Sequence, residues 1–238
     1  MKELEDHKWF SPLLRNFQTE FIGFVVVRLH VYDAFIERLK RQAVPSCPMI
    51  DLCSGSGEPA ITVFRKSKRF SRLLLTDKFP GRLAVNDKRI TYQQQPADAL
   101  GMHFEPRTTY TMFNALHHFS DEDKLWLVKK IQAANANAVF VEILEPGFFC
   151  FLKVLLTSTI GCLLFTPFIK PFSFARLFFT YIIPLNILTI TFDGIVSVFK
   201  SRSVNDYKKL FANEKQVEVV RIQNRLSPLI LIQVNAIA

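Results

Sequence analysis

Two hydrophobic patterns follow one another along the chain: short apolar runs, and apolar residues repeated at helical spacing. The short runs, rich in β-branched and aromatic residues, predict seven strands at residues 49–52, 72–76, 90–94, 109–113, 138–144, 217–222 and 228–234. The helical spacing predicts helices at residues 12–42, 61–68, 121–134 and 204–213. Ser120 or Asp121 is the expected N-cap of the third helix, whose first turn is acidic.

Strands that alternate with helices in this way predict an α/β fold with a doubly wound, mostly parallel sheet of seven strands. Only residues 223–227 separate the last two strands, too few for a parallel crossover, so we expect an antiparallel C-terminal hairpin. The predicted parts are an N-terminal helical cap (1–45), a ligand-binding core (46–147), an apolar helical insertion after the fifth strand (148–192), and the last helix with the closing strands (193–238).

The insertion at residues 148–192 is apolar and basic. It contains ten of the 24 Phe residues, and its only charged residues are Lys153, Lys170 and Arg176. Its two longest uncharged runs have 16 residues each, whereas a perpendicular membrane span needs about 20. We therefore expect a helical lid that contacts a membrane surface; an inward-packed cap and a homodimer interface remain open alternatives.

Charge and cysteine content narrow the protein class. The net charge of +9 and pI of about 9.5 suit an anionic membrane or nucleic acid, and equally a merely soluble protein. The four cysteines form no CxxC pair and no His lies at a ligand-like spacing from them, so no metal site is expected. Because they also form no disulfide framework, we expect a cytoplasmic protein with peripheral contact at the inner face of the membrane.

The clearest chemical motif is DLCSGSG at residues 51–57, between a predicted strand and a predicted helix. Glycine allows a ligand to approach the backbone closely, and ligands bind at the carboxyl ends of parallel strands. A tight turn without a ligand explains the motif equally well. Asp77 ends the next strand, where a carboxylate could accept both hydroxyls of a ribose or simply cap a helix. Asp98 follows the third strand and could accept from an adenine amine.

Together the segments DLCSGSG, LLLTDK, PADAL and FNALHHF resemble the class I S-adenosylmethionine (SAM)-dependent methyltransferases over residues 46–145. The segments FDGIVSVFKSRSVNDYKKLF and RIQNRLSPLILIQV are similar to the last helix and closing hairpin of that family. The resemblance implies SAM as cofactor, with a binding set of Asp51, Cys53, Ser54, Gly55, Gly57, Asp77, Lys78, Asp98, Ala99 and Asn114.

In the implied roles, Asp51, Gly55 and Gly57 line the methionine end of SAM, Asp77 binds the ribose and Asp98 the adenine edge. Cys53 stands where the family usually has its first glycine, which puts the geometry of the turn in question.

Three residues are candidates for the chemistry of transfer. A hydroxyl acceptor must lose its proton, and His117 and His118 are candidate bases because histidine titrates near neutrality; either one could instead pack against the sheet. Asp193 is either a second acid near the acceptor or the N-cap of a helix that starts at Gly194, the reading the sequence favours. Glu145 could line the pocket, and Glu142 is expected to face a cation or solvent.

The sequence thus predicts a SAM-dependent methyltransferase that acts on an apolar, lipid-like or aromatic small molecule at a membrane surface. Three alternatives remain, one of which is a true membrane protein with two spans. An RNA or DNA methyltransferase would suit the charge, although no NPPY-like aromatic clamp for a flipped base is present. A non-catalytic SAM-fold protein that serves as a membrane-associated partner is the third. The third glycine of a GxGxxG dinucleotide motif is missing, which argues against a NAD(P) dehydrogenase.

Overall fold

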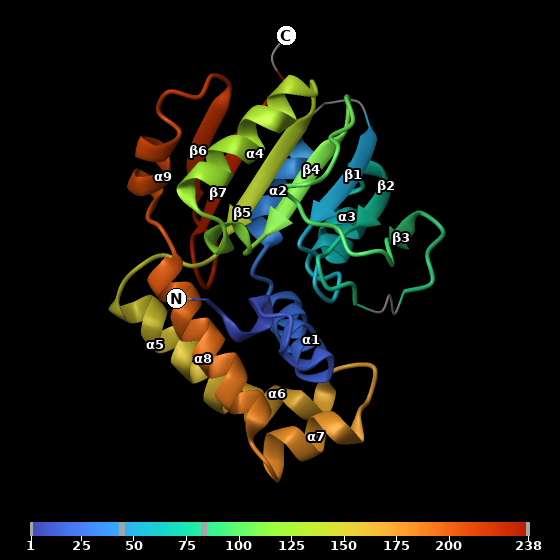
Figure 1. The fold of residues 1–238 in the computed structure, drawn as a ribbon, viewed down its shortest axis with the longest axis vertical. Coiled ribbons are helices and arrows are strands. Elements are labelled where there is room, and N and C mark those ends of the chain that lie inside the picture. Colours follow the sequence, from blue (N-terminus) through green and yellow to red (C-terminus); the bar gives the residue numbers. More distant parts are fainter. Residues whose placement is uncertain (1, 43–45, 82–84, 237–238) are drawn as a thin grey trace.

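A computed structural model describes residues 2–42, 46–81 and 85–236. Its centre is a seven-stranded sheet with the order β3-β2-β1-β4-β5-β7-β6 (Figure 1). The strands are β1 (Cys47–Leu52), β2 (Phe70–Leu75), β3 (Ile90–Tyr92), β4 (Thr109–Phe113), β5 (Asn137–Glu142), β6 (Val217–Ile222) and β7 (Leu229–Val234). Strands β1 to β5 pair in parallel, and β7 pairs antiparallel with β5 and β6. The predicted fold class, including the C-terminal hairpin, is confirmed.

Helices cover both faces of this sheet. Helices α2 (Asp33–Arg41) and α3 (Ala60–Ser67) pack on one face, and α4 (Asp121–Ala133) and α9 (Val204–Leu210) on the other. Because both faces are covered, the central strand β4 is buried at all five positions, as expected for the middle of a parallel sheet. The strand order reverses between β1 and β4, and ligands bind outside the carboxyl ends of the strands at such a switch point.

Two of the helices on the sheet begin with a complete capping box. At α4, the Ser120 side chain accepts from the Asp123 N–H, and the Asp123 carboxylate accepts from Ser120 in return. Ser203 and Asp206 form the same arrangement at α9. Of the two predicted caps for α4, Ser120 is therefore the correct one.

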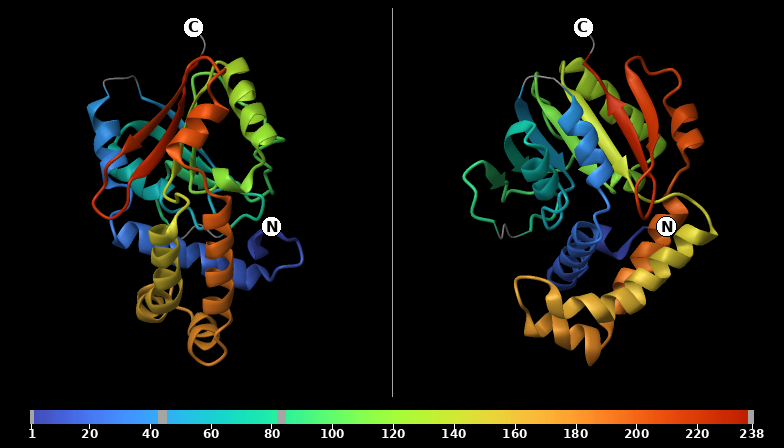
Figure 2. Two further views of the ribbon diagram at one scale, coloured as in Figure 1. Left: turned by 90° about the vertical axis from the view of Figure 1, so that its left-hand side faces the viewer. Right: turned by 180° about the vertical axis from the view of Figure 1, so that it is seen from behind.

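A second layer of helices lies beneath the carboxyl ends of the strands (Figures 1 and 2). It consists of α1 (Pro12–Arg28), α5 (Phe148–Leu156), η3 (Thr157–Gly161), α6 (Cys162–Phe165), η4 (Thr166–Phe168), α7 (Phe174–Tyr181) and α8 (Leu185–Lys200). Two short turns, η1 (Leu4–Asp6) and η2 (Leu116–His118), lie between this layer and the sheet. We call this second layer, without the two turns, the helical layer.

The single helix predicted at residues 12–42 is wrong, because the chain breaks between α1 and α2, where His30 adopts a left-handed conformation (φ 56°). The break lets α1 join the helical layer while α2 packs on the sheet. The predicted boundary at 192/193 falls inside α8, and the one after residue 45 borders a segment outside the described residues.

The first half of the insertion is one continuous helix. Residues Phe148–Phe168 form 21 consecutive helical residues. In their most apolar window of 18 residues the mean hydropathy is 2.1, and only 17% of that window is buried. By length and composition this helix could cross a membrane. Helices α7 and α8 pass the same test as a pair but bend by 76° at their junction.

Candidate functional site

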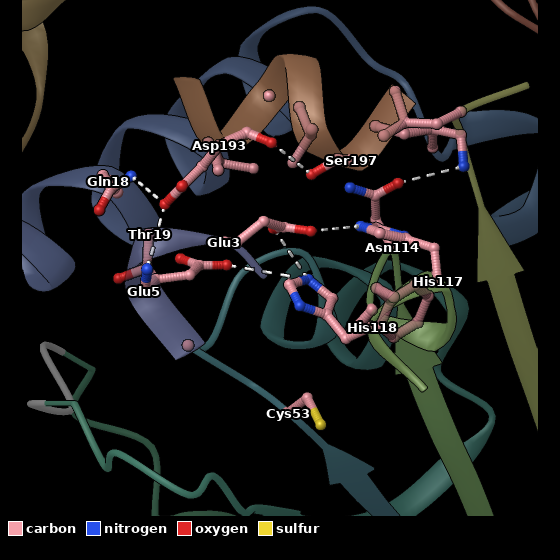
Figure 3. Close-up of a pocket in the computed structure, with 18 of the residues that line it drawn as sticks. Glu3, Glu5, Gln18, Thr19, Cys53, Asn114, His117, His118, Asp193 and Ser197 are labelled. Carbon is pink, nitrogen blue, oxygen red and sulfur yellow. Dashed lines mark hydrogen bonds and ion pairs between the residues drawn. The ribbon is translucent and has the colours of Figure 1, made fainter. Parts of the chain in front are cut away.

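A cavity of about 850 Å3 separates the carboxyl ends of the strands from the helical layer. Its volume lies within the range of small-molecule sites. One end is formed by the loops after β1, β2 and β3, and the other by η1, α5 and α8. Figure 3 shows Cys53 at the first end, and Glu3 and Asp193 at the second. Eight of the ten predicted cofactor residues line it: Cys53, Ser54, Gly55, Asp77, Lys78, Asp98, Ala99 and Asn114.

The loop after β1 has three residues at positive φ, Cys53 (56°), Gly55 (52°) and Gly57 (90°). Cys53 thus adopts the backbone conformation that normally favours glycine. The turn is therefore left-handed at this position even though a cysteine stands where a glycine was expected. Its thiol lines the cavity, and burial, reinforced by Asp77 and Asp51, raises its pKa well above the usual value. This thiol is therefore protonated and is not a nucleophile at neutral pH.

Asp51 and Gly57 do not lie on the cavity wall, contrary to the roles that the resemblance implied. The Asp51 carboxylate is 2% exposed and accepts a 2.6 Å hydrogen bond from the Thr111 hydroxyl on β4. A Cβ on Gly57 would lie 2.8 Å from the Ile61 side chain. Burial against the sheet leaves both residues no access to a ligand. Their contacts instead fix the shape of the loop.

Asp77 lies where a ribose-binding carboxylate is expected. It accepts 2.8 Å hydrogen bonds from the N–H groups of Gly55 and Phe79, and it lines the cavity. Burial raises its pKa, and the two N–H groups oppose this effect. Because a carboxylate can accept about four hydrogen bonds, two remain for a ligand. The guanidinium of Arg15 lies 3.8 Å from the centre of the Phe79 ring, beside Asp77.

Asp98 and its neighbours complete this end of the cavity. The Asp98 carboxylate pairs with the Lys78 ammonium at 3.0 Å; burial acts to raise the pKa of Asp98, but the Lys78 hydrogen bond holds it below the usual value. Asn114, at the end of β4, lies at φ 50°, and its side-chain oxygen accepts from the N–H of Ile143.

His117 is held at the other end of the cavity by Glu142. Its Nδ1 lies 2.8 Å from one oxygen of Glu142, and the other oxygen accepts from the Leu116 N–H at 2.7 Å. The side chains of His117 and Glu142 are each 1% exposed. Of the two expected surroundings of Glu142, a cation or solvent, solvent is wrong, because its side chain is buried against the His117 imidazole. The Nε2 of His117 has no hydrogen-bond partner among the described residues.

His118 is surrounded by carboxylates. Its Nδ1 lies 3.1 Å from Asp6, and its Nε2 lies 3.4 Å from Glu3 and 3.8 Å from Glu5. Burial alone would lower its pKa, but the hydrogen bond to Asp6 and the nearby charges of Glu3 and Glu5 raise it to about 9. His118 is therefore a cation at neutral pH, so it lacks the lone pair that a base needs, which leaves His117 as the candidate base.

Asp193 is not a helix N-cap, because α8 begins eight residues earlier and continues through it. Its carboxylate is 5% exposed and accepts from the N–H of Leu4 (2.6 Å), the Gln18 amide (2.9 Å) and the N–H of Glu5 (3.2 Å). Burial raises its pKa, against these hydrogen bonds. Asp193 lines the cavity and anchors the N-terminal segment there.

The N-terminal segment is the part of the site that sequence analysis missed. Glu3, Glu5 and Asp6 line the cavity, and Figure 3 shows Glu3 between Asp193 and the two histidines. Burial raises the pKa of Glu5 to about 7, an effect that His118 opposes. No local signal marks these residues, because their partners lie more than 100 positions away. Glu145, by contrast, pairs with Arg221 and does not line the cavity.

No protein-family model and no curated protein matches this chain. Solved structures do. The S-adenosylmethionine-dependent methyltransferase SibL, in its apo form, has a TM-score of 0.52 at 14% identity, over 90% of this chain and 57% of SibL. The pyocyanin biosynthetic protein PhzM has a TM-score of 0.50 at 15% identity, over 84% of this chain and 54% of PhzM. The chain thus has the class I methyltransferase fold, and it spans little more than half of these two proteins.

Proposed function

We propose that the protein is a SAM-dependent methyltransferase whose acceptor is an apolar, lipid-like or aromatic small molecule. The observation that supports this most is the position of Asp77. At the switch point of a methyltransferase-type sheet, it lines a cavity large enough for a cofactor and an acceptor, with two acceptor positions left for ribose hydroxyls. SAM, when bound, supplies an already activated methyl group, so the protein's task is to position the acceptor and exclude water.

The arrangement of His117 and Glu142 supports proton removal from a hydroxyl acceptor. His117 lines the cavity, and when its Nδ1 proton is donated to Glu142, its Nε2 carries a lone pair that can accept a proton. The Glu142 carboxylate also stabilises the imidazolium that forms. Ile190 and Val154, from α8 and α5, line the same end and suit an apolar acceptor.

The exposed surface of the helical layer supports contact with a bilayer. Its large exposed apolar side chains include Phe174 (80% exposed) and Phe149 (79%), and further members are Phe148, Phe168, Phe172, Ile182 and Leu188. Of the three basic residues in the insertion, Lys170 is exposed beside these rings, whereas Arg176 is buried and paired with Glu20. A large apolar surface with a basic residue and no acidic one in the segment suits an anionic lipid surface.

Vesicle flotation tests the membrane part of this proposal. We expect the protein to float with vesicles that contain anionic lipid, and less with neutral ones. Replacing Phe172 and Phe174 with serine should reduce flotation at least about 10-fold, because it removes two exposed rings. The matched control is Trp126→Ser on α4, which lies on the sheet. Equal flotation of all three proteins would refute membrane contact, and concentration-dependent dimerisation through the same rings would favour the homodimer alternative.

Binding of SAM to Asp77 variants tests the cofactor part. Asp77→Ala should weaken SAM binding at least about 10-fold, because hydrogen bonds between hydroxyls and a charged group contribute about 1.5–3 kcal/mol. Asp77→Asn can still accept from the Gly55 N–H, so its affinity for SAM should lie between those of Asp77→Ala and wild type. The control is Asp87→Ala, since Asp87 pairs with Arg89 and does not line the cavity. Unchanged affinity in a folded Asp77→Ala protein would remove Asp77 from the ribose role.

A further inference from the structure

The acceptor end of the cavity brings together three side chains that metal ions bind. One ring nitrogen from each of His117 and His118 and a carboxylate oxygen of Glu3 all lie within 4.8 Å of one another. The separation is 4.0 Å between His117 Nε2 and Glu3, and 3.4 Å between His118 Nε2 and Glu3. Two ligands about 2.1 Å from a tetrahedral ion lie roughly 3.4 Å apart, so small side-chain shifts would suffice.

The buried Nε2 of His117 is the independent observation that points to a ligand. The side chain is 1% exposed, and this nitrogen has no hydrogen-bond partner among the described residues. A buried polar atom without a partner costs about 1–3 kcal/mol in general, so native proteins rarely leave one. Glu142 binds the opposite nitrogen, as carboxylates do behind metal-bound histidines, where they fix the tautomer and orient the ring.

The surrounding charge also favours a cation. The carboxylates of Glu3, Glu5, Asp6 and Asp193 lie in this part of the cavity wall. Lys200 neutralises part of this charge, with its ammonium 3.1 Å from one oxygen of Glu3 and 3.8 Å from Asp6. Glu3 has a second oxygen, which faces His118 and is available to an ion.

We propose that Glu3, His117 and His118 form a site for one transition-metal ion of the zinc type. Two imidazole nitrogens select zinc, cobalt or nickel over magnesium and calcium, which prefer oxygen ligands. The sequence gave no indication of such a site, because Glu3 lies more than 100 positions before His117 and His118. The ion occupies the lone pair that the proposed function gives to the base, so the ion-bound and base-competent states exclude each other.

Titration of the full chain with zinc, and with cobalt as a spectroscopic probe, tests this site. At pH 8, where ligands release protons more readily, wild type should bind one equivalent of zinc, and cobalt should give a visible absorption band. Glu3→Gln and His118→Asn should each weaken zinc binding at least about 10-fold, and Glu142→Gln about 10- to 100-fold. Lys200→Gln should strengthen it, because Lys200 competes for Glu3. The control is His103→Asn, since His103 is exposed and not in the cavity wall.

Absence of stoichiometric binding to wild type, or equal affinity in Glu3→Gln, His118→Asn and the control, would overturn the proposal. Circular dichroism of each variant separates loss of the site from loss of the fold. The zinc result is independent of the cofactor, so a protein that binds zinc but not SAM would refute the proposed function and leave this site intact.

Discussion

Asp51→Asn should make the protein's stability less dependent on pH. The Asp51 carboxyl is buried behind the loop after β1, where burial raises its pKa from 3.8 to about 7 against the hydrogen bonds of Thr111 and Ser54. Because the folded pKa is the higher one, the favourable contribution to stability is complete below pH 4 and is lost as the pH rises through 7.

The size of this effect follows from the two pKa values. With 3.8 in the unfolded chain and about 7 in the folded protein, linkage gives a loss of about 2.5 kcal/mol between pH 5 and pH 8. Asparagine has nearly the same shape, carries no charge and can still accept the Thr111 hydrogen bond. The variant should therefore gain about 2.5 kcal/mol relative to wild type over this interval.

Urea unfolding, followed by circular dichroism at pH 5, 6, 7 and 8 without ligand, measures the difference. Other groups that titrate in this range, such as Glu5, are present in both proteins and cancel. Glu218→Gln, which removes an exposed carboxylate on β6, is the control and should run parallel to wild type. A parallel course for Asp51→Asn as well would refute the reasoning, because it would mean that Asp51 is already ionised at pH 5 in the folded protein.

Substitutions at three further positions test local features by urea or thermal unfolding. Cys53→Gly should change stability by less than about 1 kcal/mol, whereas Cys53→Val should lower it by about 2 kcal/mol, since a β-branched residue is strained at φ 56°. Ser203→Ala should cost about 1 kcal/mol through loss of the capping box at α9; no change would mean that the cap is not formed. Arg176→Met should cost about 2 kcal/mol, because it leaves Glu20 and two backbone carbonyls without their partner; equal stability would mean that these contacts do not stabilise the fold.

The strands were predictable because a short run of apolar residues in the local sequence marks each one. All seven lie within a few residues of their expected positions, and the loop after β1 carries its glycines where a left-handed backbone requires them. The break near His30 was missed because residues 29–32 contain neither Gly nor Pro. Tertiary packing of α1 and α2 in different layers imposes it.

The acceptor end of the site could not be predicted, because long-range contacts build it. Asp193 followed by Gly194 looks like a helix start, yet its partners Leu4 and Gln18 are 189 and 175 positions away. A separation of more than 100 positions likewise makes Glu3 invisible to any interpretation of the FNALHHF motif. Which histidine keeps a free lone pair is likewise decided by Glu142 and Asp6, and not by the motif itself.

Calorimetric titration of the purified protein with SAM and with S-adenosylhomocysteine, beside a NAD control, tests the central claim most directly. The proposed function predicts micromolar binding of both sulfur nucleotides and no binding of NAD. A folded protein that binds neither sulfur nucleotide would contradict it, because the turn at Gly55 and the carboxylate of Asp77 would then serve the fold alone.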